Sequence, residues 1–258
     1  MRINRHSIAL VQRSGINVGG YRGEGIDIQN VLQGVERAIA GKNWVRDGEF
    51  PALRRLTPSS RKRLYISTGI HGDEPAGPLA LLQLLEEDRW PKEAALWICP
   101  CLNPTGFPLN QRENAQGIDL NRDYRHFRSA EARAHAAWLQ EQPRFDLALC
   151  LHEDWEAHGF YLYELNPDAR PSLAEKLVEA VAKVCPIDRS PVIEGREARD
   201  GIIRPKINLA ERPQWPEAFY LISHKTRLSY TLEAPSDFPL ATRVAALVTA
   251  VRAVLELP

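Results

Sequence analysis

Short apolar runs alternate with longer amphipathic stretches along the chain from residue 54 onward. Apolar runs of roughly four to eight residues bounded by turn residues are typical of buried strands, and longer segments with apolar positions at helical spacing are typical of helices. This pattern predicts strands at residues 64–69, 94–100, 146–151, 160–163 and 228–232. It predicts helices at residues 75–85, 129–142, 172–184 and 239–255.

Residue choices at the predicted helix starts support this interpretation. Proline is well suited to a first helical turn, because its missing N–H has no partner there, and Pro75 occupies such a position. Ser172 and Glu175 have the spacing of a capping box, in which each side chain binds a backbone N–H of the other. An acidic residue near a helix start, such as Glu131, complements the helix dipole.

Strands and helices that alternate with short connections indicate an α/β fold. We expect a single-domain mixed, largely parallel sheet with helices on both faces. In such sheets ligands bind outside the carboxyl ends of the strands. Polar side chains follow several predicted strands, and we expect these to converge on one crevice: His71, Glu74, Asn103, His152 and Glu233.

Two segments depart from this pattern. Residues 1–53 contain several glycines that indicate loops or a hairpin, with a helix predicted at residues 31–40. We expect residues 1–53 to form an N-terminal extension packed on a catalytic domain of residues 54–258. The irregular stretch 196–216 is predicted to be a loop over the crevice.

Composition excludes two classes of partner. The chain has 33 basic and 33 acidic residues, which is unlike the basic footprint of a nucleic-acid binder. No apolar run reaches the roughly 18 residues needed to span a membrane, and the N-terminus leads into no apolar segment typical of a secretory signal. We expect a soluble, cytoplasmic protein with neither a nucleic-acid nor a membrane partner.

The cysteines do not form a zinc-ribbon pattern. Cys99 and Cys101 are separated by one residue, and no second pair has metal-binding spacing. Cys99 and Cys150 lie in apolar runs, and the remaining cysteine is Cys185. We expect all four to be small buried hydrophobic residues in a reducing compartment.

The residues around His71 and His152 suggest a hydrolytic metal site. Catalytic zinc takes three protein ligands, commonly His and Glu, and keeps a fourth position open. His71 and Glu74 are three residues apart in a turn at a strand end, and His152 follows another strand. Each alone is a weak indication, because a histidine at a strand end is commonly a hydrogen-bonded structural residue.

Taken in order, the motifs resemble those of the zinc carboxypeptidases. The similarity is greatest to the short bacterial branch that includes murein peptide amidases. The related aspartoacylase and succinylglutamate desuccinylase group shares the metal motif and the Asn-Arg pair. The resemblance covers residues 63–255, leaves residues 1–53 unexplained, and is carried by these segments: His71-Gly72-Asp73-Glu74-Pro75, Asn103-Pro104-Thr105-Gly106, Arg112, Gly117-Ile118-Asp119-Leu120-Asn121-Arg122, Leu151-His152 and Thr231-Leu232-Glu233.

The resemblance implies one zinc ion per chain, held by His71, Glu74 and His152. It implies that Glu233 is the general base, which takes a proton from water and passes it to the leaving amine. Arg112 matches the arginine that polarises the scissile carbonyl and steadies the oxyanion. A salt-bridged Glu233 and a solvated Arg112 are the structural alternatives.

The same resemblance implies a carboxylate-binding pair and a supporting aspartate. Asn121 and Arg122 match the residues that bind the terminal carboxylate of the substrate, for which a guanidinium fork is well shaped. Arg122 has the alternative of an ion pair with Asp119 or Asp123. Asp119 matches an aspartate that orients a metal-bound imidazole, here His71, with an Asx turn as the alternative.

The leading hypothesis is a zinc metallocarboxypeptidase that hydrolyses a C-terminal amide bond of a peptide or peptide-like substrate. The alternative is a deacylase of a small N-acyl amino acid with the same metal centre. Either substrate carries a free carboxylate. A third hypothesis is a binding protein without catalysis, which the complete residue set argues against. The polar residues at 153–158 leave a second metal open, although we expect these acids to tune the site or bind a cationic part of the substrate.

Overall fold

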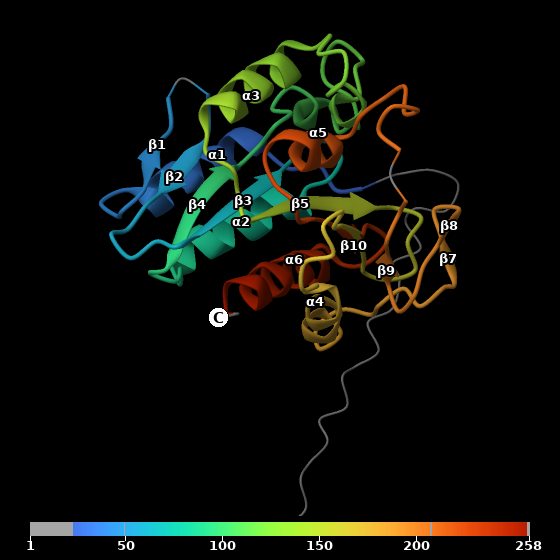
Figure 1. Cartoon of the computed structure of the whole chain (residues 1–258). Helices are drawn as coiled ribbons and strands as arrows, with labels where there is room; N and C mark the ends of the chain where they lie inside the picture. Colours follow the sequence, from blue (N-terminus) through green and yellow to red (C-terminus); the bar gives the residue numbers. More distant parts are fainter. Residues whose placement is uncertain (1–22, 49, 207, 257–258) are drawn as a thin grey trace, which may run out of the picture.

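The computed structural model describes residues 23–48, 50–206 and 208–256. Within these residues, eight strands form one sheet in the order β1-β2-β4-β3-β5-β10-β6-β9, and β7 and β8 form a separate hairpin (Figure 1). The strand bounds are β1 Val45–Arg46, β2 Leu53–Arg55, β3 Lys62–Thr68, β4 Ala94–Cys99, β5 Leu147–Asp154, β6 Tyr161–Leu165, β7 Val192–Ile193, β8 Arg196–Glu197, β9 Ile202–Ile203 and β10 Ser229–Pro235.

Six α-helices and two short 3-10 helices lie within the described ranges. Their bounds are α1 Ile28–Ile39, α2 Ala76–Glu87, η1 Phe107–Leu109, η2 Leu120–Arg122, α3 Ala130–Glu141, α4 Ala174–Val181, α5 Glu217–His224 and α6 Leu240–Leu255. None of these helices is both long enough and apolar enough to cross a bilayer.

The centre of the sheet is parallel, as predicted. Strands β4, β3, β5 and β10 run in one direction, whereas β2 pairs antiparallel with β4 and β6 pairs antiparallel with β10. The sheet is therefore mixed and largely parallel. The four parallel strands end at the same edge, which is where ligands bind in sheets of this kind.

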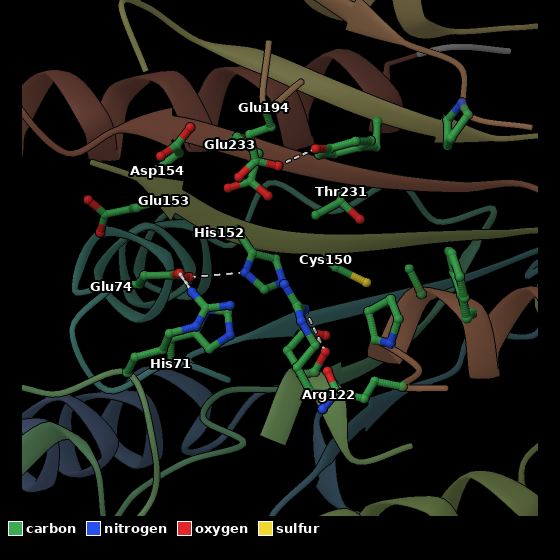
Figure 2. A pocket seen from close by; sticks show the side chains of 18 of the residues that line it. His71, Glu74, Arg122, Cys150, His152, Glu153, Asp154, Glu194, Thr231 and Glu233 are labelled. Carbon is green, nitrogen blue, oxygen red and sulfur yellow. Dashed lines mark hydrogen bonds and ion pairs between the residues drawn. The ribbon is translucent and has the colours of Figure 1, made fainter. Parts of the chain in front are cut away.

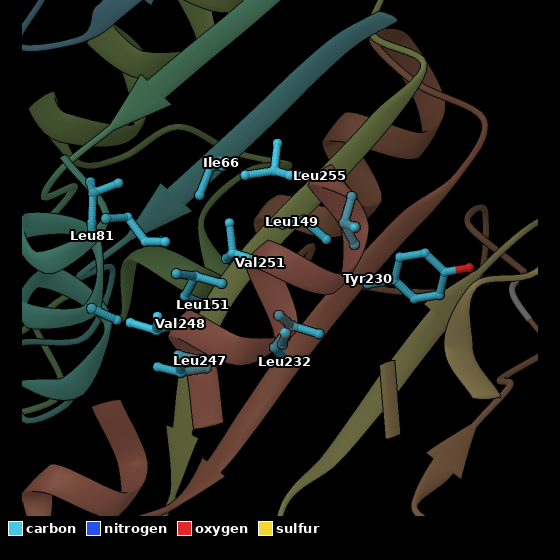
Figure 3. Packing of buried hydrophobic residues seen from close by; sticks show 14 of the residues in the cluster. Ile66, Leu81, Leu149, Leu151, Tyr230, Leu232, Leu247, Val248, Val251 and Leu255 are labelled. Atoms are coloured by element: carbon cyan, nitrogen blue, oxygen red, sulfur yellow. The ribbon is translucent and has the colours of Figure 1, made fainter. Parts of the chain in front are cut away.

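Helices cover both faces of the sheet, as also predicted. On one face, side chains of β3, β5 and β10 pack against α6, and α1, α2 and α4 extend the same core (Figure 3). The apolar positions of β5 on this face alternate along the strand at Leu147, Leu149 and Leu151. The intervening positions Ala148 and Cys150 belong to the second core, on the face that α3 and α5 cover.

Two strands extend further than their apolar runs predict. β5 reaches Asp154 and β10 reaches Pro235, so His152 and Glu233 lie within the last part of a strand and do not follow it. The reason is mutual pairing: the ladder of the two strands continues to the pair Pro235 and Asp154. The expectation that both polar residues lie at the carboxyl edge is nevertheless confirmed.

The predicted capping box is wrong. Helix α4 begins at Ala174 with Leu173 at the N-cap, and no side chain caps it. Ser172 Oγ instead accepts the N–H of Ala174 at 3.1 Å, and lies 3.3 Å from a carboxylate oxygen of Glu175. The helix also ends at Val181, three residues before the predicted end at residue 184.

Part of the predicted N-terminal extension joins the main sheet and core. Helix α1 packs against α2, and Val35 and Ile39 belong to the larger hydrophobic core. Strand β2, which begins at residue 53, pairs with β4. Residues 1–22 lie outside the described residues, so the division at residue 53 stays a prediction.

Candidate active site

The turn between β3 and α2 carries two of the predicted ligands. His71 and Glu74 are buried in this turn, and α2 begins two residues after Glu74. The turn lies against the loop that contains Gly106. A Cβ atom on Gly72 would lie 2.2 Å from the carbonyl carbon of Gly106, so only glycine fits this close approach. Asn103 supports the second loop, because its Oδ1 accepts the Gly106 N–H at 2.9 Å.

The three predicted ligands meet, as the sequence predicts. His71 Nδ1 lies 2.5 Å from Glu74 Oε1, and His152 Nδ1 lies 3.0 Å from Glu74 Oε2. One ligand atom from each residue lies within 4.8 Å of the others, and all three side chains are buried. Figure 2 shows the two imidazoles pointing toward the carboxylate between them. Two imidazole nitrogens and a carboxylate oxygen form a donor set that suits zinc.

The protonation of these groups is strongly coupled. Burial acts to raise the pKa of Glu74, but the adjacent imidazoles of His71 and His152 outweigh it and hold that pKa below its usual range. Burial lowers the pKa of His152. The pKa of His71 is raised, because Glu74 and Asp119 outweigh burial. Glu74 is therefore held as a carboxylate, which is the form that binds a metal.

Asp119 and Arg112 lie beside His71. Asp119 Oδ1 is 3.4 Å from His71 Nε2, on the opposite side of the ring from Glu74. The second oxygen of Asp119 accepts from Arg112 Nε at 2.9 Å. Arg112 Nη1 lies 3.4 Å from His71 Nδ1 and 3.9 Å from Glu74 Oε1. The guanidinium group thus lies next to the point where the ligand atoms converge.

Glu233 is placed by the register of β10 on β5. It lies opposite His152 in this parallel pair. Two residues earlier on each strand, Thr231 lies opposite Cys150. The four side chains therefore face the same side of the sheet. Burial raises the pKa of Glu233 well above its usual range, and the negative charges of Glu74 and other nearby acids add to the effect.

Asn121 and Arg122 lie in η2 and line the same pocket. Asn121 Oδ1 accepts the backbone N–H of Glu217 at 2.9 Å. Arg122 Nη1 donates to the carbonyl of Asn121 at 2.8 Å, and its exposed guanidinium forms no ion pair with a carboxylate in the described part of the chain. The alternative partner Asp123 is occupied by Arg128 and Ser129.

The pocket around these residues has a volume of about 360 Å³. Such a volume is within the usual range for a small-molecule site. The stretch 196–216 borders the pocket, as predicted, but it is not one loop, because it contains β8 and β9; the residues that it contributes to the lining are Arg196, Pro205, Arg212, Pro213, Gln214 and Pro216. Uncharged side chains line another part of it: Leu165, Ala218, Phe219 and Thr231.

Glu194 is a pocket residue that the sequence does not reveal. It lies with Gly195 in the tight turn between β7 and β8, and both have positive φ angles. It accepts a hydrogen bond from the hydroxyl of Tyr163, and Figure 2 shows it near Glu233. The Glu-Gly pair is a turn signal that could have located the hairpin. Nothing local places that hairpin over the pocket.

The polar segment after His152 divides between two faces of the sheet. Glu153 points away from the metal ligands. Each of its carboxylate oxygens accepts one hydrogen bond, from Ala76 N and from Arg243 Nη1, at 2.5 Å each. Asp154 faces the pocket and accepts from the hydroxyl of Tyr161 at 3.0 Å. Among the residues with described positions, the ligand cluster at His71 is the one group with metal-binding spacing.

The four cysteines are free and buried, as predicted. Cys150 alone among them lines the pocket that the structure describes. Burial raises the pKa of its thiol well above the usual value. Cys150 is therefore a neutral, small side chain in the pocket lining and not a reactive thiolate.

Comparison with known proteins places these features in a family. Residues 60–190 match the succinylglutamate desuccinylase/aspartoacylase catalytic domain. The chain is 35% identical to carboxypeptidase SOL1 of Arabidopsis thaliana over 104 residues, which cover 32% of this chain and 21% of that protein. It is 37% identical to carboxypeptidase 2 of Trichophyton rubrum over 76 residues, covering 26% and 14%. The chain thus matches about a fifth or less of the length of these curated relatives.

Solved structures share the fold over most of the chain. A candidate metallopeptidase from Shewanella amazonensis has a TM-score of 0.73 and 26% identity, covering 88% of this chain and 91% of the other. A metallo-carboxypeptidase from Burkholderia cenocepacia has a TM-score of 0.67 and 18% identity, covering 90% and 69%. The second similarity is one of fold alone.

Proposed function

Because the chain belongs to the succinylglutamate desuccinylase/aspartoacylase catalytic-domain family, with a carboxypeptidase-like fold, we propose that it is a zinc-dependent metallocarboxypeptidase. Its reaction is hydrolysis of a C-terminal amide bond in a small peptide or peptide-like substrate. One observation carries the proposal: two imidazoles and a carboxylate converge at one end of a pocket whose lining also includes Glu233, Arg112 and Arg122, and Arg122 forms no ion pair with any residue that the structure describes.

The ligand cluster fits zinc, with one ion per chain held by His71, Glu74 and His152. All three side chains are buried and Glu74 is held as a carboxylate, so a charged ligand already lies between the two imidazoles. When bound, zinc supplies a Lewis acid that polarises the scissile carbonyl and lowers the pKa of water. Asp119, beside Nε2 of His71, fixes the orientation and tautomer of that ring.

Glu233 is the general base in this proposal. Its position opposite His152 aims a carboxylate into the pocket, within the part of the sheet edge that holds the ligands. There it takes a proton from the attacking water and transfers it to the leaving amine nitrogen. Arg112, next to Glu74 and His71, donates to the oxygen of the carbonyl as negative charge develops on it.

Asn121 and Arg122 bind the terminal carboxylate of the substrate. The guanidinium of Arg122 is exposed to the pocket and its only hydrogen bond among described residues is to the Asn121 carbonyl. Its remaining N–H groups form a planar fork that matches a carboxylate. This grip sets which amide bond reaches the ligand cluster, so cleavage occurs at the last residue.

A second candidate is a deacylase that removes a small acyl group from an amino acid. The family match over residues 60–190 supports it, because that family is described by succinylglutamate desuccinylase and aspartoacylase. Both reactions use the same ligands and the same carboxylate grip. A direct comparison of kcat/KM for short peptides and for N-acyl amino acids distinguishes them, and we expect the peptides to be the better substrates.

Zinc content and a base substitution test the proposal. Purified protein should contain about one zinc per chain, and His71→Ala should abolish binding because a ligand is lost. Glu233→Gln should retain zinc and lose about three orders of magnitude in kcat, because the proton acceptor is gone. Glu179→Gln changes an exposed acid of α4 outside the pocket lining and serves as the control. A zinc-loaded protein that hydrolyses neither substrate class would favour a non-catalytic binding role.

We also propose a cytoplasmic location. The four buried, free cysteines support it, because such thiols persist in a reducing compartment. Fractionation of cells that produce the protein tests the location, and recovery from an extracellular fraction would contradict it.

A further inference from the structure

Glu217 is a buried acid that the proposed chemistry does not use. It is the first residue of α5 and is 1% exposed. In the described part of the chain, no Lys, Arg or His side chain forms an ion pair with its carboxylate. Burial of a carboxylate is costly unless hydrogen-bond donors replace its water. The position therefore needs a structural explanation.

Two hydroxyl groups of β3 supply those donors. Tyr65 Oη donates to one oxygen of Glu217 at 2.6 Å, and Ser67 Oγ donates to the other at 2.9 Å. Tyr65 and Ser67 are two positions apart, so both point to the face of the sheet that α5 covers. Both carboxylate oxygens thereby bind the start of α5 to a central strand of the sheet.

His135 and Tyr124 extend this network into α3 and the loop before it. Tyr65 Oη lies 2.9 Å from Nε2 of His135, and Tyr124 Oη lies 2.6 Å from Nδ1. A neutral imidazole donates through one nitrogen and accepts through the other. Because the Tyr65 proton points to Glu217, Nε2 must donate to Tyr65 and Nδ1 must accept from Tyr124. Each proton in the chain is therefore directed toward Glu217, which favours a single arrangement of these side chains.

The backbone of Glu217 connects this network to the pocket. Its N–H donates to Asn121 Oδ1 at 2.9 Å. A backbone N–H can only donate, so the contact fixes which end of the Asn121 amide is the oxygen. The nitrogen end, Nδ2, must then point away from Glu217, and Asn121 lines the pocket. Arg122 is tied to the same residue through the Asn121 carbonyl.

We propose that Glu217 is a positioning residue that holds the Asn121 amide, and Arg122 with it, in the orientation that binds the terminal carboxylate of the substrate. The inference rests on the proposed function, because it takes Asn121 and Arg122 as the carboxylate-binding pair. Glu217 touches neither the substrate nor the reacting atoms. It acts through its backbone N–H, whose position is fixed by the two hydrogen bonds from β3.

Glu217→Gln tests this role with little change in volume. The amide oxygen can still accept from one of the two hydroxyls, but the NH2 group cannot accept from the other, so that hydrogen bond must reverse and the hold of β3 on the start of α5 changes. We expect KM for a peptide with a free carboxylate to rise roughly tenfold, the effect of losing one hydrogen bond to a charged group. The kcat value and the zinc content should stay near those of the wild type. KM for the same peptide with a C-terminal amide should not change.

Three single variants and one double variant accompany this measurement. Tyr65→Phe removes one of the two donors and should give the same KM effect, although Tyr65 does not line the pocket. Asn121→Ala should also raise KM, and the double variant with Glu217→Gln should add little, because both changes act on one contact. Glu164→Gln is the control: Glu164 is buried on β6, accepts from the Tyr230 hydroxyl at 3.0 Å and from Arg204 Nε, and does not line the pocket that contains Asn121.

The outcomes separate this inference from the proposed function. A raised KM in Asn121→Ala with an unchanged KM in Glu217→Gln overturns the positioning role alone. An unchanged KM in both variants overturns the carboxylate-binding assignment of Asn121, and the inference falls with it. The same KM effect in Glu164→Gln would falsify the positioning role, because it would mean that loss of any buried glutamate loosens the pocket.

Discussion

Among single residues, Arg122 and Arg112 show how neighbours determine what an arginine can do. Arg112 donates to Asp119 at 2.9 Å and is thereby held beside His71. Arg122 forms no ion pair within the described ranges and keeps most of its donors for a ligand. The sequence presents both arginines as members of a motif. It does not show that Asp119 holds the guanidinium of Arg112 while that of Arg122 keeps donors for a ligand.

Arg122→Ala should therefore affect binding more than turnover. Loss of a charged hydrogen-bonding partner for the substrate carboxylate should raise KM by roughly tenfold or more, with a smaller change in kcat. Steady-state kinetics with a peptide and its C-terminally amidated form measures this, because the amidated peptide should respond little. An unchanged KM for the free acid would show that the carboxylate binds elsewhere.

Glu217 should also make stability depend on pH. Burial raises its pKa to about 7, from an ordinary value of 4.5. Its contribution to stability is thus fully present below pH 4.5 and is lost as the pH rises through 7, because the folded state holds the proton more tightly. Each pH unit between the two values contributes about 1.4 kcal/mol, so the total is on the order of 3 kcal/mol.

Glu217→Gln removes this pH dependence. The unfolding free energy of the variant, relative to wild type, should increase on the order of 3 kcal/mol from pH 4.5 to 8. Urea denaturation at a series of pH values measures the difference. A difference that stays constant over this range would contradict the raised pKa of Glu217.

For helices and strands, the apolar runs of the sequence predicted where each element lies better than where it ends. Buried runs such as residues 64–69 mark the central strands, because both faces of a parallel sheet are covered. The last part of β5 is polar and carries His152, so its apolar run stops early although pairing with β10 continues. Strands β7, β8 and β9 have two residues each, which is too short for any periodicity. Their places depend on tertiary contacts.

The turn from β3 to α2 requires a glycine at position 72. Gly72→Ala should push the His71–Glu74 turn away from Gly106, because the added Cβ would lie 2.2 Å from a backbone carbon. We expect a loss of about 2 kcal/mol or more in unfolding free energy, together with weaker zinc binding. Gly25→Ala is a suitable control, since its Cβ would meet its nearest neighbour at 4.0 Å. Equal stability of the two variants would refute this argument.

For the whole molecule, the ligand cluster joins segments far apart in the sequence. His71 and Glu74 precede α2, His152 lies in the last part of β5, and Glu74 hydrogen-bonds to both imidazoles. A metal bound by all three in the folded state alone must stabilise the fold by mass action. Zinc at a thousandfold excess over its Kd should contribute about 4 kcal/mol.

Chelation should therefore lower the thermal midpoint of unfolding. For a chain of this size the expected decrease is roughly 10 °C. Scanning calorimetry with and without a chelator measures it, and readdition of zinc should restore the midpoint. His71→Ala should show no response to either treatment. A midpoint that is the same with and without the chelator in wild-type protein would mean that the cluster does not hold the ion.

The β7–β8 hairpin stands outside the eight-stranded ladder, yet its tip brings Glu194 to the pocket. Mutations in residues 192–197 need not disturb the strands that carry His152 and Glu233. Natural selection can therefore change the substrate specificity of the pocket without changing the residues proposed for catalysis. Related proteins would then acquire new substrate preferences through substitutions in this hairpin, while the proposed metal ligands and general base stay the same.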